Sequence, residues 1–133
     1  MKDILHDIQQ YNPHLTISKV VAFFERKGLT ITKSMIQNYV RDGLLPPPVG
    51  KRYYTHKHLA VLALVLKLKT VYEMADIKAV IEPLMDAEGI SLELYRQCVR
   101  SAGEIGMPQS DILTMMAYSV DVKDEALRRI HNV

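Results

Sequence analysis

Most apolar residues of the chain recur every three or four positions, which is the spacing of one face of a helix. The first clear stripe predicts a helix over residues 18–27, which Thr16 or Ser18 can cap and Gly28 can end. Its apolar side chains are Val20, Val21, Phe23 and Phe24. Polar residues separate these positions, so the pattern indicates a helix with one buried face.

A second stripe predicts a helix over residues 33–42, with Thr32 or Ser34 as its cap and Gly43 at its end. Its inward residues are Met35, Ile36, Tyr39 and Val40. Two helices of about ten residues joined by a short turn are typical of a helix-turn-helix. The stripe leaves an outward face made of Lys33, Ser34, Gln37, Asn38 and Arg41. Such side chains bond phosphates and base edges, although an ordinary solvated helix face would also fit.

The stretch that follows Gly43 departs from helical spacing. Residues 46–48 are three consecutive prolines, which are stiff, extended and unable to continue a helix. Gly50 allows a turn, and residues 51–54 have the composition of a short strand. We therefore expect a small β wing with Lys51 and Arg52 near its tip, anchored to the core by Tyr53 or Tyr54.

The next predicted helix starts after Thr55, and residues 59–66 within it are apolar on every side. Such a helix must be covered on more than one face. The helix-turn-helix can cover one face, and either the C-terminal half or a second subunit must cover the others. A further helix is predicted near residues 72–84, which Pro83 ends or kinks. Its inward residues are Met74, Ile77, Val80 and Ile81.

Two more helices are predicted in the C-terminal part. Ser91 can cap the first, whose stripe is Leu92, Tyr95, Cys98, Val99 and Ala102. Pro108 suits the start of the second. The second carries a roughly heptad pattern made of Ile112, Leu113, Met116, Ala117, Val120, Leu127 and Ile130. This last helix can pack on its own chain or form a dimer, and the pattern does not choose between them.

The predicted fold is mainly α, a winged helix-turn-helix with a short β wing followed by a small C-terminal helical region. We expect a first domain over residues 1–88 and a dimerisation or effector region over residues 89–133. Charge differs between the two halves of the chain. Residues 1–70 have a net charge of +7 and residues 71–133 a net charge of −5. A basic first half favours a polyanionic partner for that half, although a basic solvated face is equally compatible.

Several classes of function find no support in the sequence. It contains no glycine-rich phosphate loop, zinc-protease motif or nucleophile elbow, so we expect no enzyme and no cofactor. Cys98 is the only cysteine, which excludes an intrachain disulfide and a thiolate zinc site. His56 and His58 suit polar roles at the wing base better than metal binding. The apolar run is too short for a membrane span, so we expect a cytoplasmic protein without a membrane partner.

Three segments give the chain a resemblance to the DNA-binding domain of the MerR family of bacterial transcription regulators. "IQNYVRDGLLPP" supplies Ile36, Tyr39, Gly43, Leu44, Leu45 and Pro47. "GKRYY" supplies Gly50, Arg52 and Tyr54, and "LVLKLKTVYEMADIKAVI" supplies the later part with Ile77. The whole chain is also similar to an uncharacterised bacterial family of MerR-like proteins.

The resemblance implies a sequence-specific regulator that binds double-stranded DNA, as a homodimer and with an unknown effector or protein partner. The residues expected to contact DNA are Thr32, Lys33, Ser34, Gln37, Asn38, Arg41, Lys51, Arg52 and Tyr54. Gln37 and Asn38 are the expected base readers, and the cations are the expected phosphate contacts. The alternative hypothesis is a non-enzymatic protein-interaction module that keeps the winged helix as a scaffold.

Overall fold

A computed structural model describes residues 7–8, 14–98 and 112–131 of the protein. These residues form a mainly helical fold, as predicted. The elements are α2 (Ile17–Arg26), α3 (Lys33–Arg41), α4 (His56–Leu68), α5 (Met74–Ile81), the 3-10 helix η1 (Glu82–Leu84), α6 (Leu92–Cys98) and α8 (Ile112–His131). None of the helices in these ranges combines the length and the apolar character needed to cross a membrane.

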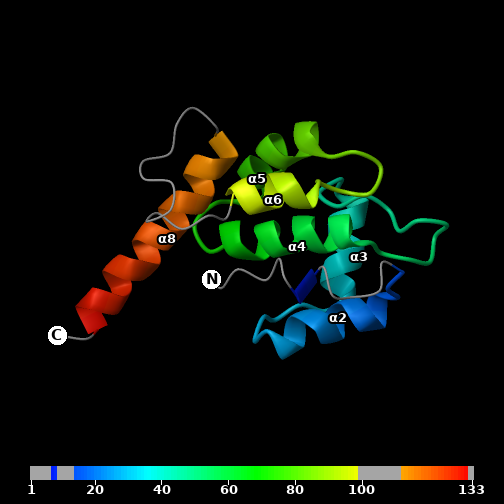
Figure 1. Ribbon diagram of the computed structural model, residues 1–133, viewed down its shortest axis with the longest axis horizontal. Coiled ribbons are helices and arrows are strands. Elements are labelled where there is room, and N and C mark those ends of the chain that lie inside the picture. Colours follow the sequence, from blue (N-terminus) through cyan, green and yellow to red (C-terminus); the bar gives the residue numbers. More distant parts are fainter. Residues whose placement is uncertain (1–6, 9–13, 99–111, 132–133) are drawn as a thin grey trace.

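Helix α4 lies at the centre of the molecule, with α2 on one side and α5, α6 and α8 on others (Figure 1). Every residue of α4 from His58 to Leu68 is buried. Phe23, Phe24 and Ile36 from the first two helices belong to the same continuous core. The covering that residues 59–66 require therefore comes from helices of the same chain.

Helices α2 and α3 end in the same way, at a glycine with positive φ. Gly28 has φ 77° and Gly43 has φ 78°. Residues that carry a Cβ atom rarely adopt this backbone conformation. After α3, the Leu44 N–H donates to the Tyr39 carbonyl at 2.9 Å, and the Gly43 N–H donates to the Val40 carbonyl at 3.2 Å. These two bonds form a Schellman motif at the end of α3. Gly28 and Gly43 thus end their helices as the sequence predicts.

The predicted short strand over residues 51–54 is wrong, since the described residues contain no strand. Two isolated bridges take its place, between Leu15 and Tyr54 and between Val49 and Tyr53. A ladder of only one residue pair on each side is too short to make a strand, because the chain turns back within residues 50–52. In place of the predicted β wing, the chain makes a tight hairpin turn that the single Val49–Tyr53 pair closes at its base.

The expected inward faces also need correction at some positions. Met74 begins α5 and is 37% exposed, since the first turn of this helix lies at the edge of the core. Of the heptad positions of α8, whose partner the sequence left open, Ile112, Leu127 and Ile130 are 63%, 42% and 63% exposed and do not pack into the core. The predictions for Val99, Ala102 and Pro108 lie outside the described residues.

A buried ion pair fixes α8 against α4. Lys67 is only 4% exposed, and its Nζ donates to Asp121 Oδ1 at 2.8 Å. Nearby, the Tyr72 and Ser119 hydroxyls share a hydrogen bond of 2.6 Å. A buried charge is tolerated only when it is paired and hydrogen-bonded, so Lys67 constrains which residue of α8 lies opposite it.

We predict that Asp121→Ala lowers the free energy of unfolding by about 2–3 kcal/mol, because the Lys67 charge would then be buried without its partner. Lys67→Met should cost less, since it removes the buried charge and keeps an aliphatic chain of similar length. Urea denaturation followed by circular dichroism measures both losses. Equal losses in the two variants would contradict an uncompensated charge as the cause.

Candidate nucleic-acid interface

Helix α3 presents one polar face to solvent. Thr32 caps the helix, and its Oγ1 accepts a hydrogen bond from the Met35 N–H at 3.1 Å. Ile36 is buried beneath, and Met35, Tyr39 and Val40 are half-buried. The exposed side chains are Lys33, Ser34, Gln37, Asn38 and Arg41. The outward face predicted from the stripe is therefore present, while Thr32 has a capping role.

Residues 49–53, which follow the prolines and carry two cations, form a hairpin. We refer to these five residues as the hairpin. At its base the Val49 N–H donates to the Tyr53 carbonyl at 2.7 Å, and the Tyr53 N–H donates back at 3.1 Å. At its tip the Arg52 N–H donates to the Val49 carbonyl at 3.2 Å. Gly50 and Lys51 both have positive φ, 60° and 62°. Positive φ at both central residues is the geometry of a type I′ turn.

Lys51 is the one described residue other than glycine with positive φ. A side chain at such a position costs roughly 1–2 kcal/mol relative to ordinary backbone, and asparagine, aspartate or glycine is the usual occupant. The lysine side chain is exposed, and nothing in the core requires it. Strain of this kind is found at functional positions more often than elsewhere.

Tyr54 anchors the hairpin from below. Its N–H and carbonyl exchange hydrogen bonds with Leu15, of 2.7 and 2.9 Å. Its side chain is 5% exposed, and its ring meets the His58 ring edge-on with centroids 5.2 Å apart. Burial raises the pKa of the Tyr54 phenol. These contacts match the anchoring role predicted for Tyr53 or Tyr54, and they place Tyr54 below the surface rather than on it.

His58 joins the proline segment to the start of α4. Its Nδ1 accepts from the Thr55 N–H at 3.0 Å, which leaves Nε2 to carry the proton and donate to the Pro47 carbonyl at 3.0 Å. Thr55 and His58 together form a capping box at the start of α4. The imidazole is fully buried. It therefore serves as a structural link at the base of the hairpin, which is the polar role predicted for it.

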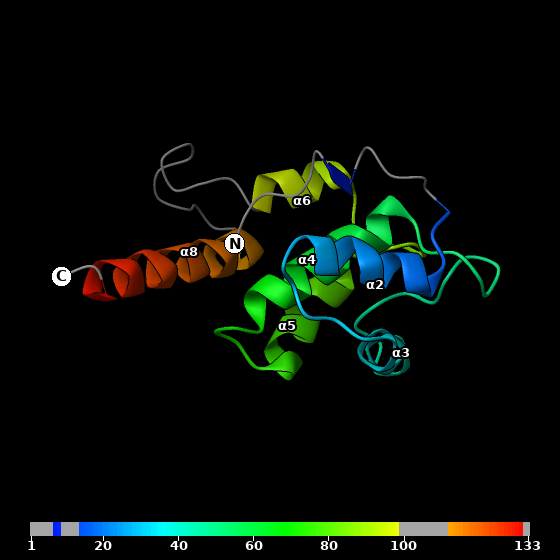
Figure 2. The ribbon, with the colours of Figure 1, turned by 90° about the horizontal axis from the view of Figure 1, so that it is seen from below.

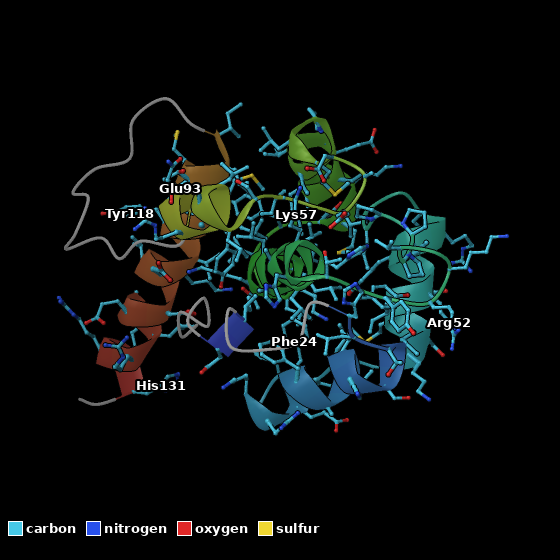
Figure 3. All side chains as sticks on the ribbon, turned by 45° about the vertical axis from the view of Figure 1, so that its right-hand side comes forward. Phe24, Arg52, Lys57, Glu93, Tyr118 and His131 are labelled. Carbon is cyan, nitrogen blue, oxygen red and sulfur yellow. The ribbon has the colours of Figure 1, made fainter. Side chains whose placement is uncertain are left out.

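A pocket of about 470 Å³ brings α3 and the hairpin together. It is lined by Thr16, Ile17, Gln37, Val40, Pro48, Lys51, Arg52 and Tyr54. Three exposed residues of the predicted contact set, Gln37, Lys51 and Arg52, thus share one concave surface with the buried Tyr54. Lys33, Ser34, Asn38 and Arg41 are on the exposed face of α3 but do not line this pocket. Figure 3 shows Arg52 at the outer edge of the molecule, beside α3.

Thr16 is a lining residue that the sequence analysis considered only as a helix cap. It occupies the cap position of α2, but its side chain makes no capping hydrogen bond. The positive φ of Lys51 was also missed. Glycine before a lysine predicts positive φ only at the glycine, so no signal in the sequence indicates it at Lys51. Among the described residues, no three His, Cys, Asp or Glu side chains are grouped to hold a metal ion.

Comparison with known proteins gives one match. Residues 6–98 match the family described as Domain of unknown function (DUF1836). The chain belongs to this family. No curated protein and no solved structure matches the chain.

The resemblance to MerR regulators, and to MerR-like proteins over the whole chain, is therefore wrong as an assignment. The family match is to DUF1836, and no MerR or winged helix-turn-helix family matches. The residues that carried the resemblance include Gly43 and Leu44, which form the Schellman ending of α3, and Pro47, which follows it. Any helix that ends in this way before a turn can use the same residues.

His58 gives a prediction for pH. Burial lowers its pKa below the ordinary value of 6.5, although the bond to the Pro47 carbonyl acts in the opposite direction. The unfolded chain therefore binds this proton more readily than the folded protein does. The contribution of neutral His58 to stability is complete above pH 6.5 and is lost progressively as the pH falls below it. Thermal denaturation at several pH values between 7 and about 5 measures this loss.

The matched variants are His58→Gln and His56→Gln. Glutamine is usual three residues after the cap residue of a capping box and does not titrate, so His58→Gln should flatten the pH dependence. His56 is half-buried at the first position of α4, and its replacement should leave the dependence in place. A profile that keeps its slope in His58→Gln would show that another group is responsible.

Proposed function

We propose that this protein is a sequence-specific DNA-binding regulator of transcription that uses α3 and the hairpin as one surface. Helix α3 would enter the major groove of double-stranded DNA, and the hairpin would follow the adjacent phosphate backbone. A major groove about 12 Å wide admits a single helix. We also propose that the protein acts by binding and carries out no catalysis.

The observation that supports this proposal best is the conformation of Lys51. A strained backbone position holds a cation at the tip of an exposed turn, where glycine, asparagine or aspartate fits more easily. Arg52 follows it, and both line the same pocket as Gln37 of α3. A positive charge kept there against the backbone preference suits an anionic partner, and phosphates supply such charges at regular spacing.

The other exposed residues divide into two roles under this proposal. Gln37 and Asn38 carry amides that can donate and accept toward one base edge, so they are the proposed base readers. Lys33, Arg41, Lys51 and Arg52 would contact phosphates. Helix α3 itself has no carboxylate to repel the backbone, and Asp42, which directly follows it, has its Oδ1 3.4 Å from Arg41 Nε. Ser34 adds a hydroxyl near the start of the helix, where anions are favoured.

Lys51→Gly separates charge from backbone strain. Glycine accepts positive φ, so this variant should unfold with unchanged free energy or with a gain of up to about 1 kcal/mol. At the same time it removes one proposed phosphate contact. The slope of log K against log salt should therefore fall by about one unit for random and specific DNA alike. Arg52→Ala should give the same loss of slope.

Fluorescence anisotropy with labelled duplexes at several salt concentrations measures these slopes. The control is Lys69→Ala, because Lys69 is an exposed lysine at the far end of α4 from the hairpin (Figure 1). An unchanged slope in both hairpin variants would refute the phosphate role of the hairpin. An equal reduction in Lys69→Ala would show that binding follows total charge and not this surface.

Base reading has its own test. Binding to fragments of the source genome, followed by sequencing of the retained fragments, should first yield a preferred site. Asn38→Ala should then cost about 1–3 kcal/mol at that site and leave affinity for random DNA unchanged. An equal loss on both would exclude Asn38 as a base reader. Retention of no fragment by the folded protein would favour the protein-interaction alternative.

A further inference from the structure

The pocket between α3 and the hairpin also borders the start of α2, where Thr16 and Ile17 contribute to its wall. In two perpendicular views the start of α2, α3 and the hairpin lie at the same end of the molecule (Figures 1 and 2). The volume of about 470 Å³ is within the range of sites that hold a small organic molecule. The pocket therefore has room for more than one phosphate group.

Tyr54 gives this pocket a hydroxyl group that the protein itself does not use. The residue is only 5% exposed, and the hydroxyl of such a buried tyrosine usually has a hydrogen-bond partner. The Tyr54 hydroxyl has none among the described residues. In the same part of the chain, no fully enclosed side-chain oxygen or nitrogen lacks a partner. The hydroxyl is therefore open to the pocket that Tyr54 lines, where it can donate to a ligand.

The charges around the pocket favour an anion. Lys51 and Arg52 line it, and neither forms an ion pair with a described residue. None of the eight lining residues is acidic. The first turn of α2 also holds no acidic residue, and the Thr16 side chain makes no capping hydrogen bond with it. The free N–H groups and the dipole at such a helix start attract negative charge.

The rest of the wall differs from that of a plain phosphate site. Ile17, Val40 and Pro48 are apolar, and Gln37 carries an amide that can both donate and accept. An apolar surface suits a flat heterocyclic ring, and an amide can bond the donor and acceptor atoms at the edge of that ring. A free phosphate or a sugar phosphate would leave both of these features unused.

We infer that this pocket binds a nucleoside monophosphate. The phosphate lies between Lys51, Arg52 and the start of α2, and the base lies on the apolar wall beside Gln37. A phosphate monoester carries close to two negative charges at neutral pH and has three acceptor oxygens, which matches two cations and a donating hydroxyl. Nucleotide binding does not depend on DNA. Only one consequence rests on the proposed function, namely that the nucleotide competes with DNA for Lys51 and Arg52.

An amide NMR titration of the full chain with AMP, GMP, CMP and UMP tests the site without DNA. At least one nucleotide should bind with a Kd of about 1 mM or tighter. The shifts should concentrate on residues 16–17, 37 and 50–54. Ribose 5-phosphate keeps the phosphate and lacks the base, so it should bind roughly tenfold more weakly or worse. No binding by any of the four, shifts elsewhere, or equal affinity for ribose 5-phosphate would overturn the inference.

Tyr54→Phe isolates the hydroxyl group. This variant should bind the nucleotide roughly three- to tenfold more weakly and unfold at an unchanged temperature, because the hydroxyl bonds nothing within the protein. The matched control is Tyr39→Phe, since Tyr39 is a half-buried tyrosine of α3 that does not line the pocket. Unchanged affinity in Tyr54→Phe, or an equal loss in Tyr39→Phe, would contradict the proposed site.

Fluorescence anisotropy with a labelled duplex, with and without the best-bound nucleotide, tests the competition. The nucleotide should lower the affinity for DNA in the wild type and do so less in Tyr54→Phe at the same concentration. A nucleotide that binds without lowering DNA affinity would refute the competition. A chain that binds the nucleotide but no DNA would uphold this site and refute the proposed function, so the two can fail separately.

Discussion

A helix that is apolar on all sides cannot face water, and this constraint on α4 determines where the other helices lie. Its residues 59–66 offer no polar edge, so neighbours must pack around the whole circumference. The chain supplies them from both directions, with α2 before α4 and with α5, α6 and α8 after it. Each outer helix needs only one apolar face to pack on α4, and most of them carry an apolar stripe on a single face.

Helix α4 has two buried polar side chains, one near each end, and each has a partner outside the helix. His58 bonds the proline segment that precedes the hairpin, and Lys67 bonds Asp121 of α8. Eight residues of helix lie between them, and the nine steps from one to the other span about 14 Å. Apolar packing alone would let neighbouring helices slide, whereas a buried polar pair holds only in one register. The central helix thus aligns the hairpin at one end and α8 at the other.

Helical periodicity was enough to predict the helices and the outward face of α3, because these depend on local spacing and on glycine at helix ends. It could not predict which helices cover α4, since a helix without a polar face has no preferred direction. The turn at Gly50 and Lys51 was located, but residues 51–54 were assigned to a strand because tyrosines favour strands. The MerR assignment failed for a related reason. Gly43, Leu44 and Pro47 meet the local needs of a helix end and a turn, and such needs recur in unrelated proteins.

The strained lysine at the hairpin tip has a consequence for how this position can change. Lysine and asparagine codons differ only in their third nucleotide, and asparagine accepts positive φ more readily than lysine does. A single point mutation would therefore relax the backbone at residue 51 and remove its charge together. Selection for folding alone would favour that step. A lysine or arginine kept at this position throughout the family would indicate that selection acts on the positive charge and not on the preference of the residue for positive φ.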